Sequence, residues 1–205
     1  FEYVSNVARI SSDITKLDGD MYAGYNYSGV HKLPDGRLMA CMHQHWGPTP
    51  DFETPCVAFS SNDGMTWSEV EFVTTPGTFC GPVVGPRAES APGNDAGFKD
   101  NSRQRCPVAL VTSDGRIVIL FARRTADRGC RGIIGVISDD LGRTWSEEFV
   151  LRGDAYCWDL GYPVITELAD GRLFTAYWWT EKTGEEPVPE PELVRFIAGT
   201  TFRID

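Results

Sequence analysis

The chain has 205 residues and a formal net charge of −10, and 41% of its residues are hydrophobic. This length and composition fit a globular protein with a sizeable core. The negative charge argues against a nucleic-acid surface, which needs a basic face, so we expect no nucleic-acid partner. No apolar run approaches the roughly 20 residues of a membrane-spanning helix, so membrane insertion is not expected either.

The six cysteines leave two interpretations open. No Cys-x-x-Cys pair is present, which speaks against a zinc site, and we expect neither a metal nor a cofactor. The cysteines are either small buried hydrophobic residues or partners in disulfides. The disulfide interpretation favours an extracellular or periplasmic location.

The motif Asp-Gly-Arg recurs three times between apolar runs. The copies read LPDGRLMACMH, TSDGRIVILFA and LADGRLFTAYW, with turn glycines at Gly36, Gly115 and Gly171. Asp-Gly in this setting is the strongest short-range hairpin signal, because Gly adopts the positive φ that a tight turn needs. Each copy therefore predicts a β-hairpin.

In chain order the hairpins belong to three similar units. The first unit is expected to have strands at 27–33, 37–43, 55–60 and 68–74. The second is expected to have strands at 106–112, 116–123, 131–138 and 146–151, and the third at 162–168, 172–179 and 194–203. No segment keeps a 3.6-residue periodicity, so little helix is expected. Four-stranded sheets that repeat around an axis form a β-propeller.

A second motif, Ser-x-Asp-x-Gly-x-Thr-Trp, follows the third strand of the first two units. It reads SDDLGRTW at Ser138–Trp145, and SSNDGMTW at Ser60–Trp67 with Asn62 in the acidic position. Such a sequence suits a turn, because Asp or Asn caps backbone amides, Gly takes positive φ and Trp packs between sheets. The motif resembles the Asp-box, or bacterial neuraminidase repeat, which closes the hairpin between the third and fourth strands of a propeller blade.

The closing segment WDLGYPVITELADGRLFTAYWW resembles the sialidase-like glycoside hydrolases of the neuraminidase superfamily. The resemblance covers the chain from about Tyr27 onward. It implies an all-β fold, a β-propeller of four-stranded antiparallel blades. We expect one partial domain over 1–205, with about three blades at 22–75, 103–152 and 159–205, equivalent to the C-terminal half of a six-bladed propeller. A missing half-propeller or a second copy of the chain would complete the ring, and the segment 1–10 is a candidate for the outer strand of the third blade.

The strand order sorts the loops into two rims. The Asp-Gly-Arg turns and Asp-boxes emerge on one rim, and the long, non-repeating connections emerge on the other, where function is expected on a rigid scaffold. Those connections are rich in aromatic, acidic and arginine residues, which suit a sugar ligand. The expected substrate-binding residues are Arg123, Arg124, Arg105, His43, His45, Trp46, Trp158 and Trp178.

The resemblance also implies an activity, that of a glycoside hydrolase acting on a terminal sugar, with an acidic sugar among the candidates. True sialidases bind the sugar carboxylate through arginines and use a Tyr nucleophile, which makes them exceptions to the two-carboxylate rule. Carried onto this sequence, the expected reactive pair is Tyr162 and Asp159, and Arg123 and Arg124 are expected anion ligands. The Arg-Ile-Pro segment of sialidases has no counterpart here.

Simpler roles stay open for each of these residues. The two arginines could pair with Asp127, Glu147 or Glu148 on the surface, Asp159 could cap the turn at Gly161, and Tyr162 could pack between strands. Trp178 and Trp179 point to opposite faces of one strand, so one of them is expected in the core. For the whole protein the alternatives are a polysaccharide lyase on a propeller and a non-catalytic carbohydrate-binding propeller.

Overall fold

The computed structural model is built from eleven β-strands in the described part of the chain, which comprises residues 5–8, 22–47, 52–74, 104–123, 132–155, 160–182 and 193–204. Blade 1 contains β1 (Tyr22–Lys32), β2 (Leu38–Gly47), β3 (Phe52–Ser60) and β4 (Glu71–Phe72). Blade 2 contains β5 (Gln104–Val111), β6 (Ile117–Arg123), β7 (Gly132–Ser138) and β8 (Phe149–Arg152). Blade 3 contains β9 (Gly161–Glu167), β10 (Leu173–Lys182) and β11 (Leu193–Phe202).

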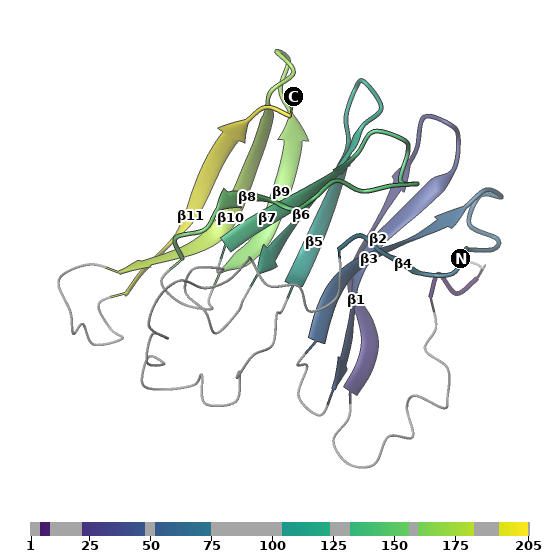
Figure 1. Ribbon diagram of the computed structural model, residues 1–205, viewed down its shortest axis with the longest axis horizontal. Coiled ribbons are helices and arrows are strands. Elements are labelled where there is room, and N and C mark those ends of the chain that lie inside the picture. The colour runs from purple at the N-terminus through teal and green to yellow at the C-terminus, as the bar shows by residue number, and fades with distance from the viewer. Residues whose placement is uncertain are drawn as a thin grey trace, which may run out of the picture.

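Neighbouring strands pair antiparallel in chain order within each blade. Figure 1 shows the three sheets side by side, fanned out as sectors of a ring. This arrangement confirms the predicted fold: the chain is all-β and forms about three blades of a partial six-bladed propeller. Among the described residues blade 3 has three strands, whereas blades 1 and 2 have four.

The predicted hairpins form where Asp-Gly-Arg stands. Gly36, Gly115 and Gly171 all have positive φ, between 77° and 91°. In each turn the Asp carboxylate accepts bonds from the backbone and the guanidinium of the Arg two residues later, as between Asp35 and Arg37. The repeated sequence therefore folds into one repeated turn.

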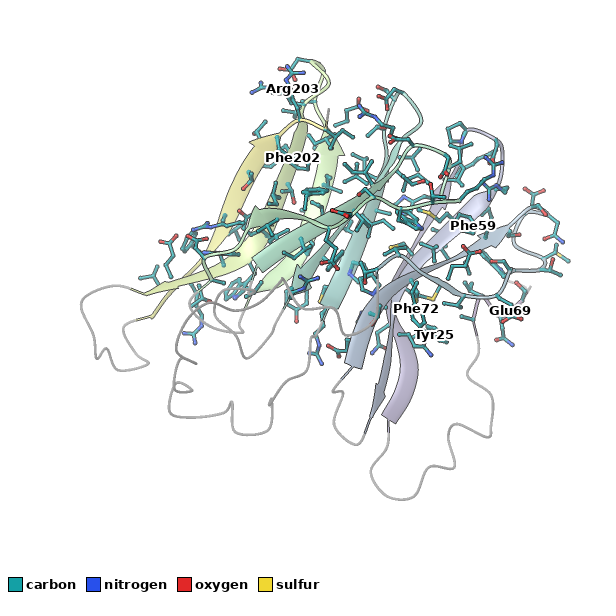
Figure 2. All side chains as sticks on the ribbon, viewed as in Figure 1. Tyr25, Phe59, Glu69, Phe72, Phe202 and Arg203 are labelled. Carbon is teal, nitrogen blue, oxygen red and sulfur yellow. The ribbon has the colours of Figure 1, made fainter. Side chains whose placement is uncertain are left out.

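Two apolar layers hold the blades together. Between blades 1 and 2 lie residues such as Met39, Val57, Ile119 and Phe121. Between blades 2 and 3 the layer is made by alternate residues of β6 and β10, including Leu120, Leu173 and Trp179. Figure 2 shows side chains filling the spaces between adjacent sheets. In blade 2, β6 thus has one face in each of the two layers, the pattern of a strand that is buried on both sides.

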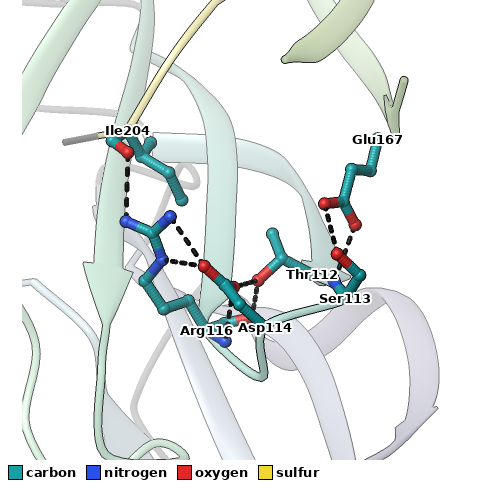
Figure 3. Close-up of polar contacts among 6 residues, drawn as sticks. All are labelled: Thr112, Ser113, Asp114, Arg116, Glu167 and Ile204. Carbon is teal, nitrogen blue, oxygen red and sulfur yellow. Dashed lines mark hydrogen bonds and ion pairs between the residues drawn. The ribbon is translucent and has the colours of Figure 1, made fainter. Parts of the chain in front are cut away.

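Polar contacts at the turn rim also cross from blade to blade. Nη2 of Arg37 donates to the carbonyl oxygen of Leu141 in blade 2, at 2.9 Å. Nη1 of Arg116 donates to the carbonyl oxygen of Ile204 in blade 3, at 3.1 Å, and Glu167 accepts bonds from Ser113 (Figure 3). The Arg of each of these two motifs therefore bonds both to its own turn and to the next blade.

The expectation that the first ten residues complete blade 3 is wrong for the residues that the structure describes. Ser5 donates to the carbonyl oxygen of Gly64, and Val7 and Ala8 pack against the outer side of blade 1. These three residues therefore lie at the other end of the three-blade arc. No helix in the described ranges is long and apolar enough to span a membrane.

Candidate functional site

The candidate site lies at the rim opposite the Asp-Gly-Arg turns. In Figure 1 these turns lie at the upper end, while β1, β5 and β9 begin and β2, β6 and β10 end at the lower end. The innermost strands β1, β5 and β9 line a cavity of about 300 Å³ along the axis side of the three blades. His31, Cys41, Cys106, Val108, Tyr162 and Val164 are among its lining residues. The cavity is therefore assembled by residues from all three blades.

Two of the cavity residues sit at matching backbone irregularities. Cys106 has a φ of 54° and Tyr162 a φ of 52°, and each precedes a proline. Both lie where the register of the innermost strand shifts, and β1 carries a similar shift between Asn26 and Gly29. Positive φ is costly for residues with a side chain, and bulges change the direction in which a side chain points. Such strain is concentrated at functional sites.

Tyr162 is the most exposed of the predicted site residues that can be described. Its side chain is 53% exposed and borders the axial cavity. The ring is held away from the apolar layer between blades 2 and 3, although its neighbour Leu160 is fully buried there. Tyr162 is therefore available to a ligand in the cavity.

Arg123 ends β6 on the face that carries Ile119 and Phe121, so its side chain enters the layer between blades 1 and 2. Only 1% of its side chain is exposed, and the guanidinium forms an ion pair with Glu148. Glu148 was one of the partners considered from the sequence, and the pair is partly buried, because 22% of the Glu148 side chain remains exposed. Arg123, which was expected to bind an anionic ligand, therefore already bonds to a carboxylate of the protein itself.

Arg105 joins blades 1 and 2 at the site rim. Its Nε donates to the Glu53 carboxylate at the start of β3, and 26% of the Arg105 side chain is exposed while Glu53 is 2% exposed. His43 lies on β2 opposite Pro55, three residue pairs before the last β2–β3 pair, and is buried at 1% exposure. The predicted arginine and histidine are thus both at this rim, but His43 belongs to the core.

His31 is a further imidazole at the cavity, and the sequence did not single it out. Burial lowers the pKa of His31 below its ordinary value of 6.5, which favours the neutral ring. It lies on β1 opposite Met39, toward the turn rim. The sequence could have pointed to His31 only through its place near the end of an innermost strand, seven residues before Leu38.

The other predicted residues divide into two groups. Trp178 is partly buried on β10 and faces away from Trp179, which is fully buried between blades 2 and 3, as expected. The backbone of His45 and Trp46 belongs to β2, while their side chains are outside the described part. Arg124, Trp158 and Asp159 lie outside the described residues.

Sequence inspection missed a cluster around Arg152 at the end of β8. Its guanidinium bonds to Asp154 at 2.9 Å and to Glu181 of blade 3 at 2.6 Å, and it lies 4.1 Å from the centroid of the Trp179 ring. Burial opposes the charge, but the bonds to Asp154 and Glu181 raise the pKa of Arg152 overall. The Arg-x-Asp spacing in LRGD mirrors the Asp-x-Arg spacing of the turns and could have signalled an ion pair.

Three of the six cysteines lie in the described part of the chain. Cys41, Cys56 and Cys106 are buried and form no disulfide, as the buried-hydrophobic interpretation predicts, while the other three lie outside the described residues. Burial raises the pKa of Cys56 to about 12, and burial also raises that of Cys41. Thiols with such pKa values remain protonated and are poor nucleophiles.

Comparison with known proteins supports the fold and a general chemical context. No family model and no curated protein matches the chain. A Hadza microbial sialidase matches with a TM-score of 0.52 and 16% identity, over 86% of this chain and 35% of that chain. The GH93 α-L-arabinofuranosidase of Fusarium graminearum, solved with arabinobiose, matches with a TM-score of 0.52 and 15% identity, over 91% and 46%. The polysaccharide lyase Uly1 matches with a TM-score of 0.54 and 16% identity, over 87% and 38%.

These similarities show a shared propeller fold. The chain spans less than half of each of the three similar structures. All three are enzymes that act on carbohydrates, and they include both hydrolases and a lyase. The chain's structural neighbours are thus carbohydrate-active propeller enzymes.

Proposed function

We propose that the chain supplies part of the active site of a glycoside hydrolase that acts on a terminal sugar, with an acidic sugar among the candidates. The observation that carries this proposal is Tyr162, an exposed tyrosine in strained backbone at the edge of a cavity formed by three blades. A nucleophile or a charge-stabilising phenol needs this kind of fixed position and open approach.

In the proposed mechanism Tyr162 stabilises or attacks the developing positive charge at the anomeric carbon. Asp159, three residues earlier in the chain, is proposed to serve as its acid or base. Attack by the Tyr162 oxygen would form a glycosyl–tyrosine bond as the bond to the leaving-group oxygen breaks, and that oxygen would take a proton from an acid. Water would then cleave the new bond and return the phenol.

We assign the arginines different roles within this proposal. Arg105 keeps a quarter of its side chain exposed and is the better candidate to bind a polar or anionic group of the sugar. Arg123 is buried against Glu148, so we propose that it holds this end of β6 in position. We keep as proposed ligands of the sugar Arg124, His45, Trp46, Trp158 and Trp178. His43 is buried, so we propose that it stabilises β2 by packing in the core.

The proposal is tested by substitution at Tyr162 in the native polypeptide. Against a panel of aryl glycosides and oligosaccharides, Tyr162→Phe and Asp159→Asn should each lower kcat at least about a hundredfold. Tyr177→Phe is the matched control, because the Tyr177 hydroxyl bonds to Thr200 inside the protein at 2.7 Å. Unchanged turnover in Tyr162→Phe would remove this residue from the mechanism.

The similarity to Uly1 favours one second candidate, a polysaccharide lyase. A lyase would remove a proton beside a uronate carboxylate and expel the leaving sugar, which forms a conjugated double bond without consuming water. An increase in ultraviolet absorbance during turnover would therefore identify the lyase, and a new reducing end without that increase would identify the hydrolase. Sugar binding without either product would identify a non-catalytic propeller.

A further inference from the structure

The side of blade 3 that faces away from blade 2 carries apolar residues at the surface. Val164 is 61% exposed, Phe174 is 38% exposed and Ile197 is 66% exposed, and with the partly buried Trp178 they form what we call the open face. They alternate along β9, β10 and β11 with residues such as Leu173 and Trp179, which are buried against blade 2. An exposed apolar sheet face of this kind marks an interaction surface.

The equivalent face of blade 2 is covered by blade 3. Ala122 pairs with Ile133 in blade 2 and Trp178 pairs with Ile197 in blade 3, at matching positions after the turn glycine. Ile133 is 0% exposed because blade 3 packs on it, whereas Ile197 is 66% exposed. The same structural position is thus core in one blade and surface in the next.

The arginines of the Asp-Gly-Arg turns form a polar contact from each blade to the next. Arg37 and Arg116 each donate to a carbonyl oxygen that follows the third strand of the next blade, as Figure 3 shows for Arg116 and Ile204. Arg172 has the same bonds to its own turn, but within the described part of the chain its guanidinium bonds only to Asp170, and its side chain is 47% exposed. It is positioned to make the same contact with another blade.

We propose that the open face docks a further antiparallel blade, carried by the same polypeptide beyond these 205 residues. That blade would bury Val164, Phe174, Trp178 and Ile197, and it would present a carbonyl oxygen to Arg172 just after its third strand. Continuity with the two existing blade interfaces sets the chemistry of this partner. The proposal concerns assembly and does not depend on the proposed activity.

One observation favours the same polypeptide over a second copy of this chain. The similar structures carry, in one chain, more than twice the length that matches here.

The test compares matched substitutions in the native polypeptide and in the 205-residue chain. In the native polypeptide, Ile197→Ser should lower the Tm about as much as Ile133→Ser, and Arg172→Ala about as much as Arg116→Ala. In the 205-residue chain, Ile133→Ser should lower the Tm by about 5–10 °C, whereas Ile197→Ser should change it by about 1 °C or less. If the shorter chain does not fold, amide hydrogen exchange of the native polypeptide decides, with β11 expected to be protected as well as β7.

Three results would overturn the proposal. The first is a native polypeptide no larger than 22.7 kDa. The second is a neutral Ile197→Ser, or rapid exchange throughout β11, in a longer native polypeptide. The third is a dimer of the 205-residue chain that Ile197→Ser dissociates, because that result would make a second copy the occupant of the open face.

Discussion

The two Asp-boxes differ at one residue and show how the motif tolerates the change. Asp140 accepts bonds from the backbone and hydroxyl of Thr144, at 2.8 and 2.6 Å. Asn62 accepts from the Thr66 backbone at 2.9 Å but donates its amide to the Thr66 hydroxyl, also at 2.9 Å. The threonine hydroxyl donates to Asp140 but accepts from Asn62, so both turns keep the same connections, although only Asp140 carries a charge at this motif position.

Because Asp140 can be protonated and Asn62 cannot, the stability of the second Asp-box turn should depend on pH in acid. Hydrogen bonds from Thr144 and Ser138 lower the pKa of Asp140 from its ordinary 3.8 to about 2. Because the folded pKa is depressed, the contribution to stability is present above about pH 4 and is lost as the pH falls toward 2. Asp140→Asn should therefore reduce the loss of Tm across this range, and Asn62→Asp should increase it. Thermal unfolding between pH 2 and pH 5 measures both, and equal slopes in all three proteins would contradict the prediction.

His31 predicts a second acid response at higher pH. Since burial lowers the pKa of His31, the unfolded chain binds a proton more readily than the folded one below about pH 6.5. The stability gained from the neutral ring is complete above that pH and is lost as the pH falls below it. His31→Gln should flatten the Tm profile between about pH 5 and 7, measured by thermal melts in matched buffers. A profile that keeps the full native slope would show that His31 does not titrate there.

At the scale of the element, two turns with the same backbone requirement have different surroundings. Gly142 and Gly171 have φ values of 86° and 77°, so an alanine is strained in either position. A Cβ at Gly142 would lie 2.6 Å from Cζ of Phe59 in blade 1, whereas nothing lies within 4 Å at Gly171. The Asp-box turn of blade 2 is therefore packed against blade 1, while the Asp-Gly-Arg turn of blade 3 is open.

Alanine substitutions should separate the cost of backbone strain, which both glycines share, from the cost of the clash with Phe59, which only Gly142 has. Gly171→Ala should destabilise the fold by about 1 kcal/mol through backbone strain alone. Gly142→Ala should cost about 1–3 kcal/mol more, because Phe59 must move. Urea unfolding of the two variants gives the difference directly, and a Gly142→Ala that is no worse than Gly171→Ala would mean that Phe59 yields without cost.

The strands were predictable from the sequence to within a few residues, for a physical reason. Asp-Gly-Arg fixes the turn, so the strands beside it begin within a residue or two of the predicted positions, such as β6 at Ile117 and β10 at Leu173. The distant ends were less accurate: β2 reaches Gly47 and β4 is reduced to Glu71–Phe72. No turn signal marks those ends, and their length depends on pairing with neighbours.

The candidate site was less predictable than the fold. The sequence placed Arg123, Arg105, His43 and Tyr162 at one rim, because strand polarity decides the rim. It did not reveal that Arg123 and His43 are buried, since burial at a strand end depends on the neighbouring blade. The ion pairs of Arg105 with Glu53 and Arg152 with Glu181 link different blades, and no local pattern encodes such a contact.

At the scale of the whole molecule, the blades are tied together at both rims. Arg37 and Arg116 cross between blades at the turn rim, and the pairs Arg105–Glu53 and Arg152–Glu181 cross at the site rim. The apolar layers lie between these two sets of polar contacts. This arrangement fixes the relative orientation of the blades, and so the shape of the axial cavity.

The Arg105–Glu53 pair should contribute much of the stability of the contact between blades 1 and 2. Arg105→Ala leaves the Glu53 carboxylate buried without its partner, and such a loss typically costs about 3–5 kcal/mol. A double substitution, Glu53→Leu with Arg105→Leu, should recover most of that loss because no buried charge remains. Chemical denaturation of the three variants checks this order, and a double variant less stable than Arg105→Ala would contradict it.

The bond from each turn arginine to the following blade also bears on how such a chain can change over generations. Each junction uses the same parts, so duplication or loss of a complete repeat leaves every remaining joint chemically intact. A one-residue insertion between Asp114 and Arg116, by contrast, would disturb a hairpin and a junction together. Lineages related to this chain should therefore vary more readily by whole repeats than within these turns.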